Sequence, residues 1–560
     1  MSGLIQSQGQ AFDVLVIGGG INGVAIAREC AQWSKRTLLV EQNDFSSGTT
    51  SRSTRIIHGG LRYLEHAEIG LVRESLRERE RLLTQSPHLV RPLQFLLALP
   101  KKSHSFLRSS LSIRTGLWLY HSWAGGKRGC AGDLAAFERQ LDNGNDWSIY
   151  SYEDAQCEFP ERLVAEWLAE SVAAGAIVCN HTRLLEISRD GVSQKTGRVT
   201  GARLRDLISG QEYAVRARHV VNATGPWADA VIGASGIATP RMIGGVRGSH
   251  LVLPRFASAP QQAIYSEAID GRPIFVIPWN EQLLVGTSEV ADANVPDNPQ
   301  PSAEERDYLF QSFARLFPHS GLTPADIRYS FAGIRPLPFA PGKPSSSVTR
   351  KHLLHDHTDE GAAGLISVIG GKLTTAASLA RDVVRKLGVD IPEPVNVFAS
   401  PADEEDVECT VRQWARLVAC KAKIPEGCAE AIAEWHGRHA LAIAHAASLD
   451  ERLREPLCQH SCHLVAEAVE AVAHESAVTL GDILLRRVPV ALGACWSEDC
   501  SREAAVKIGS ALGWDHTRVY LELSRLEEER AQFLHPKSGS PADSPQSCAG
   551  KPSPLQSEKA

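Results

Sequence analysis

The residues best suited to bind a nucleotide are three glycines and an acid near the N-terminus. Gly18, Gly20 and Gly23 follow an apolar run, Phe12 to Ile17, that reads as a strand. Glu41 follows the next such run, Thr37 to Val40. In a strand–turn–helix unit, glycines at this spacing make the tight turn, let the backbone approach a pyrophosphate and let the helix pack on the strand. The acid can accept hydrogen bonds from ribose hydroxyls. The pattern predicts a dinucleotide site, with an ordinary glycine-rich turn as the alternative.

A polar segment with catalytic residue types follows. Small hydroxyl residues run from Phe45 to Thr54, and His58 and Arg62 come after them. Small side chains let a backbone pass close to a planar cofactor, so His58 and Arg62 could face a molecule bound over that plane. A neutral histidine accepts protons near pH 7, and the arginine fork suits phosphate oxygens. The alternative is a plain polar loop.

Two later segments have the same organisation as the first. Arg218 to Val221 reads as a buried strand, and Leu365 to Ile369 as an apolar strand followed by a helix from Ala376 to Leu387. Each strand ends in a turn of small residues. The turn residues are Thr224 and Gly225 after the first strand, and Gly371, Lys372, Leu373 and Thr374 after the second. Such turns allow close approach to a cofactor, and a helix N-terminus stabilises negative charge.

The chain resembles the FAD-dependent glycerol-3-phosphate dehydrogenases of the glycine/D-amino-acid oxidase superfamily. Six segments in the family's order carry the resemblance: Val16–Gly23, His58–Leu64, Val221–Trp227, Gly248–His250, Gly333–Leu337 and Gly370–Thr375. The resemblance implies an α/β fold: a Rossmann-like FAD-binding domain of the glutathione-reductase type, an interleaved antiparallel-sheet cap domain, and a C-terminal α-helical domain. The position of the glycine-rich turn in a long chain also favours FAD over NAD.

The resemblance also implies an activity and roles for residues. The expected reaction is oxidation of sn-glycerol 3-phosphate to dihydroxyacetone phosphate by hydride transfer to FAD, with electrons passed to a quinone. Arg62 and Arg335 would grip the phosphate, Lys372 being a weaker third, and His58, or else His250, would take the hydroxyl proton. The expected cofactor-binding residues are Gly18, Gly20, Gly23, Glu41, Thr50, Ser51, Thr224, Gly225, Gly371, Lys372, Leu373 and Thr374.

The chain departs from the family pattern on the substrate side, at Glu158–Leu163, Gly286–Glu289 and Ala376–Ala377. A divergent paralogue that acts on another phosphorylated or anionic hydroxy compound is therefore one alternative. A second is an oxidase or dehydrogenase of the same fold acting on another small hydroxy or amino acid, with oxygen as acceptor. A third is a flavin-binding electron-transfer subunit without substrate chemistry.

Strands and helices that position these residues are expected in discontinuous pieces. The FAD-binding domain is predicted from residues 12–83, 158–240 and 333–387, and the cap from 84–157 and 241–332. Residues 407–533 should form a helical domain, and the Ser/Pro/Lys-rich residues 536–560 a disordered tail. Shorter expectations are a hairpin of 273–279 with 282–286, a polar loop over 292–306, a linker over 392–406, and helices over 429–447, 464–474 and 519–531.

Composition excludes several classes of protein. The chain has 560 residues, 43% of them hydrophobic, and a formal net charge of −6, which indicates a globular protein without a nucleic-acid partner. It shows no bilayer-spanning apolar run and no signal-peptide order, and its 12 cysteines lack regular spacing, so a cytoplasmic protein is expected. The dense cluster Cys458–His463 lacks a second ligand pair, and no metal site is predicted. The sequence leaves open whether the chain forms a homo-oligomer.

One basic stretch indicates a membrane partner. From Arg81 to Gly132 there is no Asp or Glu, and the cations of residues 101–128 lie among Ile113, Leu117 and Tyr120, which share a helix face with Phe106. An apolar stripe flanked by cations can lie on an anionic bilayer, at the cytoplasmic membrane face. A core helix with basic edges is the alternative.

Overall fold

The computed structural model describes residues 9–61, 68–101, 110–123, 134–142, 146–191, 197–292, 297–344, 347–392 and 404–534. Its contacts divide the chain into two compact units, with the division near residue 402. Arg62, residues 102–109 and 124–128 of the basic stretch, and the tail 536–560 lie outside the described residues.

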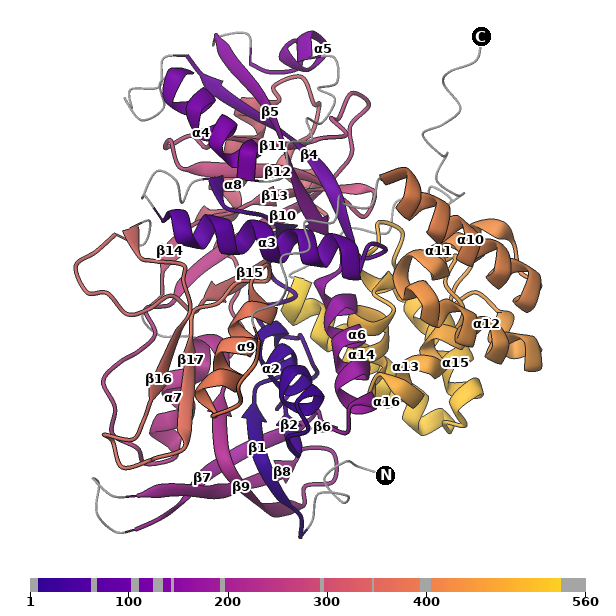
Figure 1. Ribbon diagram of the computed structural model, residues 1–560. Helices are drawn as coiled ribbons and strands as arrows, with labels where there is room; N and C mark the ends of the chain where they lie inside the picture. The colour runs from indigo at the N-terminus through magenta and orange to yellow at the C-terminus, as the bar shows by residue number, and fades with distance from the viewer. Residues whose placement is uncertain are drawn as a thin grey trace. The chain divides into compact units, whose positions relative to one another are not determined.

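The first unit contains a largely parallel sheet, sheet A, in the order β16-β17-β9-β1-β2-β6 (Figure 1). Its strands are β1 (Ala11–Ile17), β2 (Thr37–Val40), β6 (Ile177–Cys179), β9 (Glu212–Asn222), β16 (Leu353–Asp356) and β17 (Leu365–Ile369). Strand β16 is antiparallel to β17, and β7 (Thr182–Asp190) and β8 (Arg198–Asp206) extend β9 as an antiparallel meander. The predicted strands 12–17, 37–40, 218–221 and 365–369 are confirmed.

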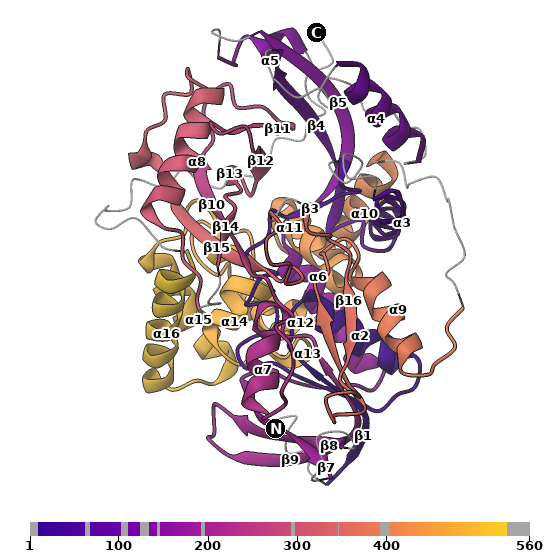
Figure 2. The same ribbon diagram turned by 90° about the vertical axis from the view of Figure 1, so that its left-hand side faces the viewer.

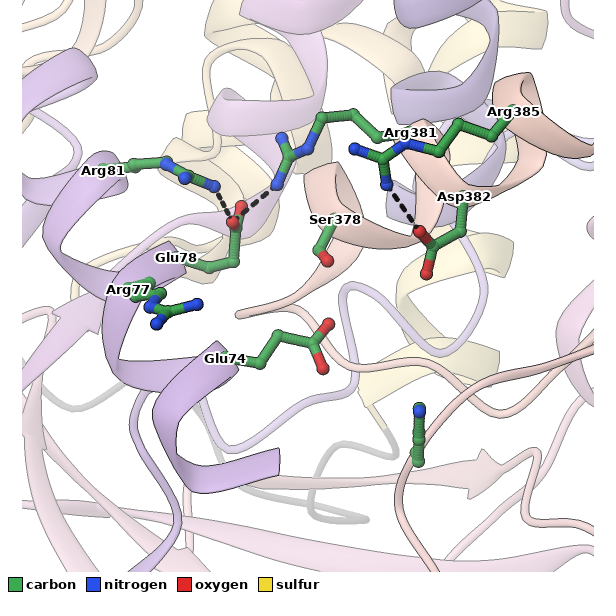
Figure 3. Close-up of a pocket in the computed structure, with 9 residues that line it drawn as sticks. Glu74, Arg77, Glu78, Arg81, Ser378, Arg381, Asp382 and Arg385 are labelled. Atoms are coloured by element: carbon green, nitrogen blue, oxygen red, sulfur yellow. Dashed lines mark hydrogen bonds and ion pairs between the residues drawn. The ribbon is translucent and has the colours of Figure 1, made fainter. Parts of the chain in front are cut away.

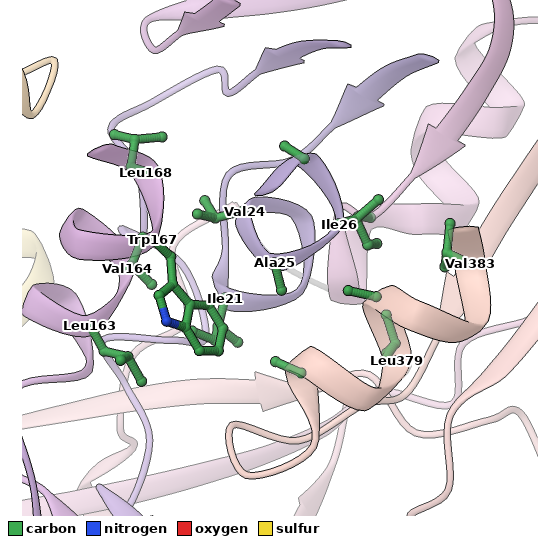
Figure 4. Close-up of a cluster of buried hydrophobic side chains, with 14 of the residues drawn as sticks. Ile21, Val24, Ala25, Ile26, Leu163, Val164, Trp167, Leu168, Leu379 and Val383 are labelled. Atoms are coloured by element: carbon green, nitrogen blue, oxygen red, sulfur yellow. The ribbon is translucent and has the colours of Figure 1, made fainter. Parts of the chain in front are cut away.

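Strand β1 is buried on both faces, which is typical of a parallel sheet covered on both sides. Val14 and Val16 pack under α2 (Ile21–Gln32), α6 (Pro160–Ala173) and α9 (Ala376–Lys386). Figure 4 shows Val24 and Ile26 of α2 between Trp167 of α6 and Val383 of α9. The alternate β1 residues pack on the opposite face, beside α7 (Ala228–Ala234). Each buried aliphatic side chain contributes about 1.5–3 kcal/mol, so this core fixes the turns at the strand ends.

The second sheet, sheet B, is mostly antiparallel, in the order β14-β10-β13-β12-β11-β4-β5-β3, with β15 paired to β10 (Figure 2). Its strands are β3 (Ile56–Ile57), β4 (Val90–Pro100), β5 (Trp147–Cys157), β10 (Val246–Pro254), β11 (Ala263–Glu267), β12 (Pro273–Trp279), β13 (Gln282–Gly286), β14 (Val290–Ala291) and β15 (Tyr329–Arg335). The predicted hairpin is confirmed as β12 and β13. Helices α3 (Ile69–Gln85), α4 (Ser110–Trp123) and α5 (Leu134–Glu138) also belong to this part of the sequence.

The prediction of a polar loop over residues 292–306 is wrong in its last part. Helix α8 (Ala303–Leu316) begins there and packs on β10. A capping box starts the helix: the Ser302 hydroxyl accepts from the Glu305 amide at 3.2 Å, and the Glu305 carboxylate accepts from the Ser302 amide at 3.0 Å. Buried Leu309 and Phe313 then hold the helix on the sheet.

The second unit is helical, as expected. Its longer helices are α10 (Glu404–Ala422), α11 (Glu426–His436), α12 (Ala440–Leu449), α13 (Val465–His474), α15 (Glu498–Leu512) and α16 (His516–Leu534). The single helix predicted over 429–447 is wrong, because Gly437 adopts φ +51° and separates α11 from α12. Helix α10 also begins at Glu404, inside the expected linker.

The domain boundaries at residues 83, 157, 240, 332 and 387 stay predictions. Strand β3 pairs within sheet B although it lies in a segment assigned to the FAD-binding domain, and β15, also in sheet B, crosses the predicted boundary at residue 332. Among the described helices, none has an apolar run long enough to cross a bilayer.

Candidate active site

The glycine-rich turn has no room for side chains at its first and last glycines. Gly18 adopts φ +103°, and its amide donates to the Val40 carbonyl at 2.8 Å. A Cβ on Gly18 would lie 2.7 Å from the Ala223 carbonyl oxygen, and a Cβ on Gly23 only 1.8 Å from the Gly18 carbonyl oxygen. The turn after β1 therefore lies tightly between α2 and the turn after β9, as a nucleotide-binding turn requires.

Glu41 lies at the end of β2, beside this turn. Its carboxylate accepts from the Gly19 amide at 2.6 Å and from the Asn43 amide at 2.9 Å. Burial raises the pKa of Glu41, although both backbone N–H groups oppose that shift. The two hydrogen bonds thus fix the Glu41 carboxylate beside the glycine-rich turn, where the sequence analysis expects a group that accepts hydrogen bonds from ribose hydroxyls.

Thr50 and Ser51 organise the polar segment that follows. The Thr50 hydroxyl accepts from the Ile21 amide at 3.0 Å, at the N-terminus of α2. The buried Ser51 hydroxyl donates to the Ser46 carbonyl at 2.7 Å. Thr50 is thereby in position at the end of the helix that would face a phosphate, whereas Ser51 stabilises the loop itself.

The same polar segment connects the two sheets. The Thr49 hydroxyl donates to the Ile334 carbonyl of β15 at 2.9 Å, and Thr54 Oγ1 lies 3.0 Å from His250 Nε2 of β10. A Cβ on Gly333 would meet Arg52 Cβ at 2.9 Å. These contacts place the nucleotide turn next to the strand that ends in Arg335.

Turns far apart in the sequence lie beside Gly18 and α2. The Thr224 hydroxyl donates to Asn222 Oδ1 at 2.7 Å, and Gly225 adopts φ +61°. Gly371 adopts φ +93°, and a Cβ there would lie 2.5 Å from Asn22 Nδ2. The glycine turns after β1, β9 and β17 therefore meet at one edge of sheet A.

His58 lies against the turn after β17. Its amide donates to Thr374 Oγ1 at 3.2 Å. Burial, with the charges of Lys372 and Arg79, lowers the pKa of His58 to about 3. The imidazole is therefore neutral near pH 7. Leu373 packs beside the core of sheet A.

Lys372 reaches toward α3. Its ammonium donates to Ser75 Oγ at 2.7 Å. Burial lowers the pKa of Lys372 to about 7, against the opposing charges of Glu74 and Glu68. This lysine therefore changes charge within the physiological pH range.

Arg335 and His250 lie on neighbouring strands of sheet B. Arg335 Nη2 donates to Thr287 Oγ1 at 3.1 Å, and a Cβ on Gly248 would lie 2.9 Å from Nη2, so the glycine leaves room for the guanidinium. His250 is buried and stacks on Phe331, with ring centroids 5.1 Å apart. Burial and the charges of Arg335 and Arg55 lower the pKa of His250 to about 3. With an exposed fraction of only 2%, His250 is better placed to hold Thr54 than to reach a substrate.

A buried polar network holds the His58 segment, and the sequence analysis missed it. Tyr120 Oη accepts from the Gly59 amide at 2.8 Å and donates to the Asp154 carboxylate at 2.7 Å. Arg79 pairs with the same carboxylate at 2.9 Å. The three side chains come from α4, β5 and α3, so no local sequence motif predicts that they meet.

A second missed pair anchors the polar segment. Arg55 forms a buried bidentate ion pair with Glu161, at 2.9 and 3.0 Å, and its guanidinium lies 4.4 Å from the centroid of the Trp279 ring. Glu161 belongs to the stretch that departs from the family pattern. Its role is to hold Arg55 of the cofactor segment in place, as bidentate pairs do well.

We expect Tyr120→Phe to lower the free energy of unfolding by about 1 kcal/mol, because the substitution removes the hydroxyl that bonds Gly59 and Asp154. Urea titration of the flavin-loaded protein measures this loss. Tyr152→Phe is the matched control, since Tyr152 packs on Tyr120 through its ring and no described residue bonds its hydroxyl. Equal effects of the two substitutions would contradict the assigned role of the Tyr120 hydroxyl.

The arrangement fits a bound dinucleotide. Three polar atoms around these turns are buried and lack a hydrogen-bond partner among the described residues: Asn22 Oδ1, Trp227 Nε1 and His250 Nδ1. Buried polar atoms are rarely left unsatisfied. Together with glycines that leave no space for a Cβ, they indicate a surface shaped for a polar ligand.

A separate pocket of about 170 Å³ lies between α3 and α9 (Figure 3). Its charges are largely paired: Arg381 bonds Glu78 at 2.6 Å, and Arg385 bonds Asp382 at 3.0 Å. Glu74, which also lines it, precedes the Ser75 that holds Lys372. The pocket thus borders the α3 side of the site without containing the predicted substrate residues.

The Cys458–His463 cluster is tied into the helical unit. His463 Nδ1 and His436 Nε2 contact the buried Glu467 carboxylate at 2.9 and 2.8 Å. Both imidazoles help to lower the pKa of Glu467. The contacts support the structural role that the sequence analysis favours.

The chain matches two known protein families. The profile of the family "FAD dependent oxidoreductase" matches residues 13–377, and that of the "C-terminal domain of alpha-glycerophosphate oxidase" matches residues 368–519. A glycerol-3-phosphate dehydrogenase of Synechocystis sp. is 39% identical over 408 residues, which is 68% of this chain and 70% of that protein. The aerobic glycerol-3-phosphate dehydrogenase of Staphylococcus aureus is 33% identical over 404 residues, 70% of each chain.

Among solved structures, the glycerol-3-phosphate dehydrogenase of Bacillus halodurans, complexed with FAD, superimposes with a TM-score of 0.72. The match covers 95% of this chain and 97% of that one, at 23% sequence identity. It shows a shared fold across both the sheets and the helical part of the sequence, and it confirms the predicted fold class.

Proposed function

The chain belongs to the family of FAD-dependent oxidoreductases, and we propose that it oxidises sn-glycerol 3-phosphate to dihydroxyacetone phosphate and passes the electrons to a quinone. The observation that carries the proposal is the meeting of His58, Lys372 and Thr374 beside turns that have the shape of a dinucleotide site. Relatives at 33–39% identity bear the name of this activity, which supports the choice of substrate.

The residues present would hold FAD. The turn from Gly18 to Gly23 and the N-terminus of α2 would take the pyrophosphate, and Glu41 would take a ribose. The turns with Thr224 and Gly371 would border the remainder of the cofactor. FAD, when bound, supplies the acceptor for a hydride.

Substrate binding falls to the cations of the site. Arg335 offers a planar fork at the end of β15 for the phosphate, and Thr287 orients that fork through its hydrogen bond. Lys372 adds a second positive charge below pH 7. Arg62, predicted with Arg335 as a main phosphate contact, stays a prediction because it lies outside the described residues.

Proton transfer is assigned to His58. Oxidation of the C2 hydroxyl requires loss of its proton, and the neutral imidazole of His58, whose backbone amide is held by Thr374, would accept it. The Gly59 amide, bonded to Tyr120, keeps the adjoining backbone in place. Fixed positions of this kind reduce the entropy that the reaction must lose.

We expect kcat/KM for the phosphorylated substrate to fall as the pH rises through about 7, because Lys372 has its pKa there and is charged only below it. His58, with a pKa near 3, stays neutral over this range and adds no inflection. Steady-state rates in wild-type protein and in Lys372→Met test this. The inflection should vanish in that variant and persist in Lys351→Met, which removes an exposed lysine; its survival in Lys372→Met would refute the assignment.

The electron acceptor needs its own test. We expect anaerobic turnover of glycerol 3-phosphate with a soluble quinone, and little peroxide when oxygen replaces the quinone. Oxygen-dependent turnover with one peroxide released per substrate would instead assign an oxidase. Activity on a small amino acid, without activity on the phosphorylated substrate, would overturn the substrate class.

The quinone and the basic stretch lead us to propose contact with a membrane surface through α4. Trp118 is 65% exposed on this helix, and Arg114 beside it is exposed, whereas Tyr120 is buried in the core. The buried Tyr120 shows that part of the predicted apolar stripe belongs to the protein interior. The exposed indole and cation remain available for lipid headgroups.

We expect the protein to sediment with vesicles that contain anionic lipid, and Trp118→Glu to weaken this binding several-fold, because the substitution removes an apolar contact and adds repulsion. Tyr520→Glu is the matched control, since Tyr520 is an exposed aromatic residue of α16, 77% exposed. Failure of the wild-type protein to bind, or equal weakening by both substitutions, would contradict the proposed surface.

A further inference from the structure

Three metal-ligand side chains converge where β16 turns toward β17, at an edge of sheet A. His355 Nε2 lies 3.0 Å from Glu360 Oε1, and His357 Nδ1 lies 3.8 Å from Glu360 Oε2. One ligand atom from each residue lies within 4.8 Å of the other two. Two imidazoles and one carboxylate at such spacing match the ligand sets of transition-metal ions.

Two of these atoms are buried without a hydrogen bond to any residue that the structure describes. His357 has an exposed fraction of 0%, and among the described residues neither His357 Nδ1 nor Glu360 Oε2 has a hydrogen-bond partner. The 3.8 Å between them is too long for a hydrogen bond. Leaving two buried polar atoms unsatisfied is unfavourable, and a cation between them would satisfy both.

The local fold holds the three residues in place. His355 is paired with Ser367 in the β16–β17 register, and the Glu360 and Ala362 amides donate to the His357 carbonyl at 3.2 and 3.0 Å. These hydrogen bonds fix the turn that brings Glu360 back to His355 and His357. The ligands are thus positioned by backbone structure and not by exposed, freely rotating side chains.

His357 also has the outer contact that metal-bound histidines usually have. Its Nε2 lies 2.8 Å from Ser367 Oγ, which fixes the ring and leaves Nδ1 facing Glu360.

We propose that His355, His357 and Glu360 bind a divalent transition-metal ion of the Zn²⁺ type, with water completing the coordination. Nitrogen ligands favour such ions over Mg²⁺ and Ca²⁺, which prefer oxygen. The role is structural: Ser367 Oγ also accepts from Asn222 Nδ2 at 3.2 Å, and Asn222 holds the Thr224 turn. The ion would thus stabilise the back of a turn that borders the cofactor site.

The test is Zn²⁺ binding to the full-length, flavin-loaded protein after treatment with a chelator. Competition against a chromophoric chelator gives affinity, and elemental analysis after dialysis gives stoichiometry. We expect one Zn²⁺ per chain, and affinity lowered at least about tenfold by His355→Ala and by Glu360→Gln. Excess Mg²⁺ should not displace the ion.

Asp359→Asn is the matched control, because it removes the same charge from the same turn at an exposed position outside the triad. Its affinity should stay within about twofold of wild type, since surface charges act weakly through solvent. Glu360→Gln keeps the side-chain shape, so a fold defect in His355→Ala leaves the test intact. No Zn²⁺ retained by the wild-type protein, or equal loss in Glu360→Gln and Asp359→Asn, would overturn the proposal.

Discussion

Gly23→Ala is expected to yield a protein that no longer retains flavin. The added Cβ would lie 1.8 Å from the Gly18 carbonyl oxygen, a backbone atom that cannot move without moving the turn itself. That displacement would shift the N-terminus of α2 away from the position in which it faces a pyrophosphate. We expect less than about one tenth of the wild-type flavin content after gel filtration, a loss of binding free energy above about 1.4 kcal/mol.

The ratio of visible flavin absorbance to protein absorbance measures this retention. Gly70→Ala provides the control, because no atom lies within 4 Å of a Cβ built there and the residue is exposed at the start of α3. That variant should keep its full flavin content. Wild-type occupancy in Gly23→Ala would show that the turn after β1 does not hold the cofactor.

Arg335→Ala should have the second largest effect, on substrate recognition. Loss of a charge-assisted contact to phosphate costs about 1.5–3 kcal/mol, so kcat/KM for glycerol 3-phosphate should fall about 10- to 150-fold. The rate on glycerol, which lacks the phosphate, should change little. Steady-state kinetics on both substrates separate a phosphate contact from a general defect of the site.

Two further variants refine this result. Arg335→Lys keeps the charge and loses the fork, so we expect an intermediate loss. Thr287→Val removes the 3.1 Å hydrogen bond that orients the guanidinium, and its effect should be smaller than that of Arg335→Ala. Equal losses on phosphorylated and unphosphorylated substrate in Arg335→Ala would mean that Arg335 supports the fold and does not contact phosphate.

The cofactor turns could be predicted from the sequence because their signals are local. Gly18, Gly20 and Gly23 directly follow an apolar strand, and Gly371 repeats the pattern after β17. Strands that lie parallel in one sheet end at the same edge, so these turns had to meet. The role of His58 as the base was predicted from the resemblance and stays a prediction, and the structure places the His58 amide against Thr374 of the turn after β17.

The supporting network could not be predicted, because its members are distant in sequence. Tyr120, Asp154 and Arg79 meet only when α4, β5 and α3 pack together. The sequence predicts Tyr120 in an apolar stripe flanked by cations. Only the folded chain shows that its hydroxyl bonds Gly59 and Asp154. No periodicity distinguishes a tyrosine that packs from one that bonds a backbone amide.

Two helix ends that the sequence analysis did not predict are nevertheless marked in the sequence. Ser302 and Glu305 have the spacing of a capping box and precede the apolar residues Leu309 and Phe313. This pattern indicates a helix start where a loop was predicted. Gly437 lies within an otherwise helical pattern and marks the break between α11 and α12. In both places the position of one residue marks a helix end: Ser302 caps the start of α8, and Gly437 ends α11.

The proposed metal ligands show the same limit. The segment Cys458–His463 contains two cysteines and two histidines, which are common metal ligands, yet His463 contacts Glu467. His355, His357 and Glu360 span an equal length of chain, and their convergence depends on the turn after β16. Residues two apart on a strand share a face, but the third ligand is set by turn geometry that the sequence does not display.

Anaerobic mixing of the purified, flavin-loaded protein with glycerol 3-phosphate tests the central claim most directly. Wild-type protein should lose its visible flavin absorbance on mixing, and a panel of unphosphorylated polyols and small amino acids should leave it unchanged. If glycerol 3-phosphate leaves the flavin oxidised while another compound bleaches it, the proposed substrate is wrong; if the isolated protein is colourless and takes up no flavin, the proposed site is wrong as well.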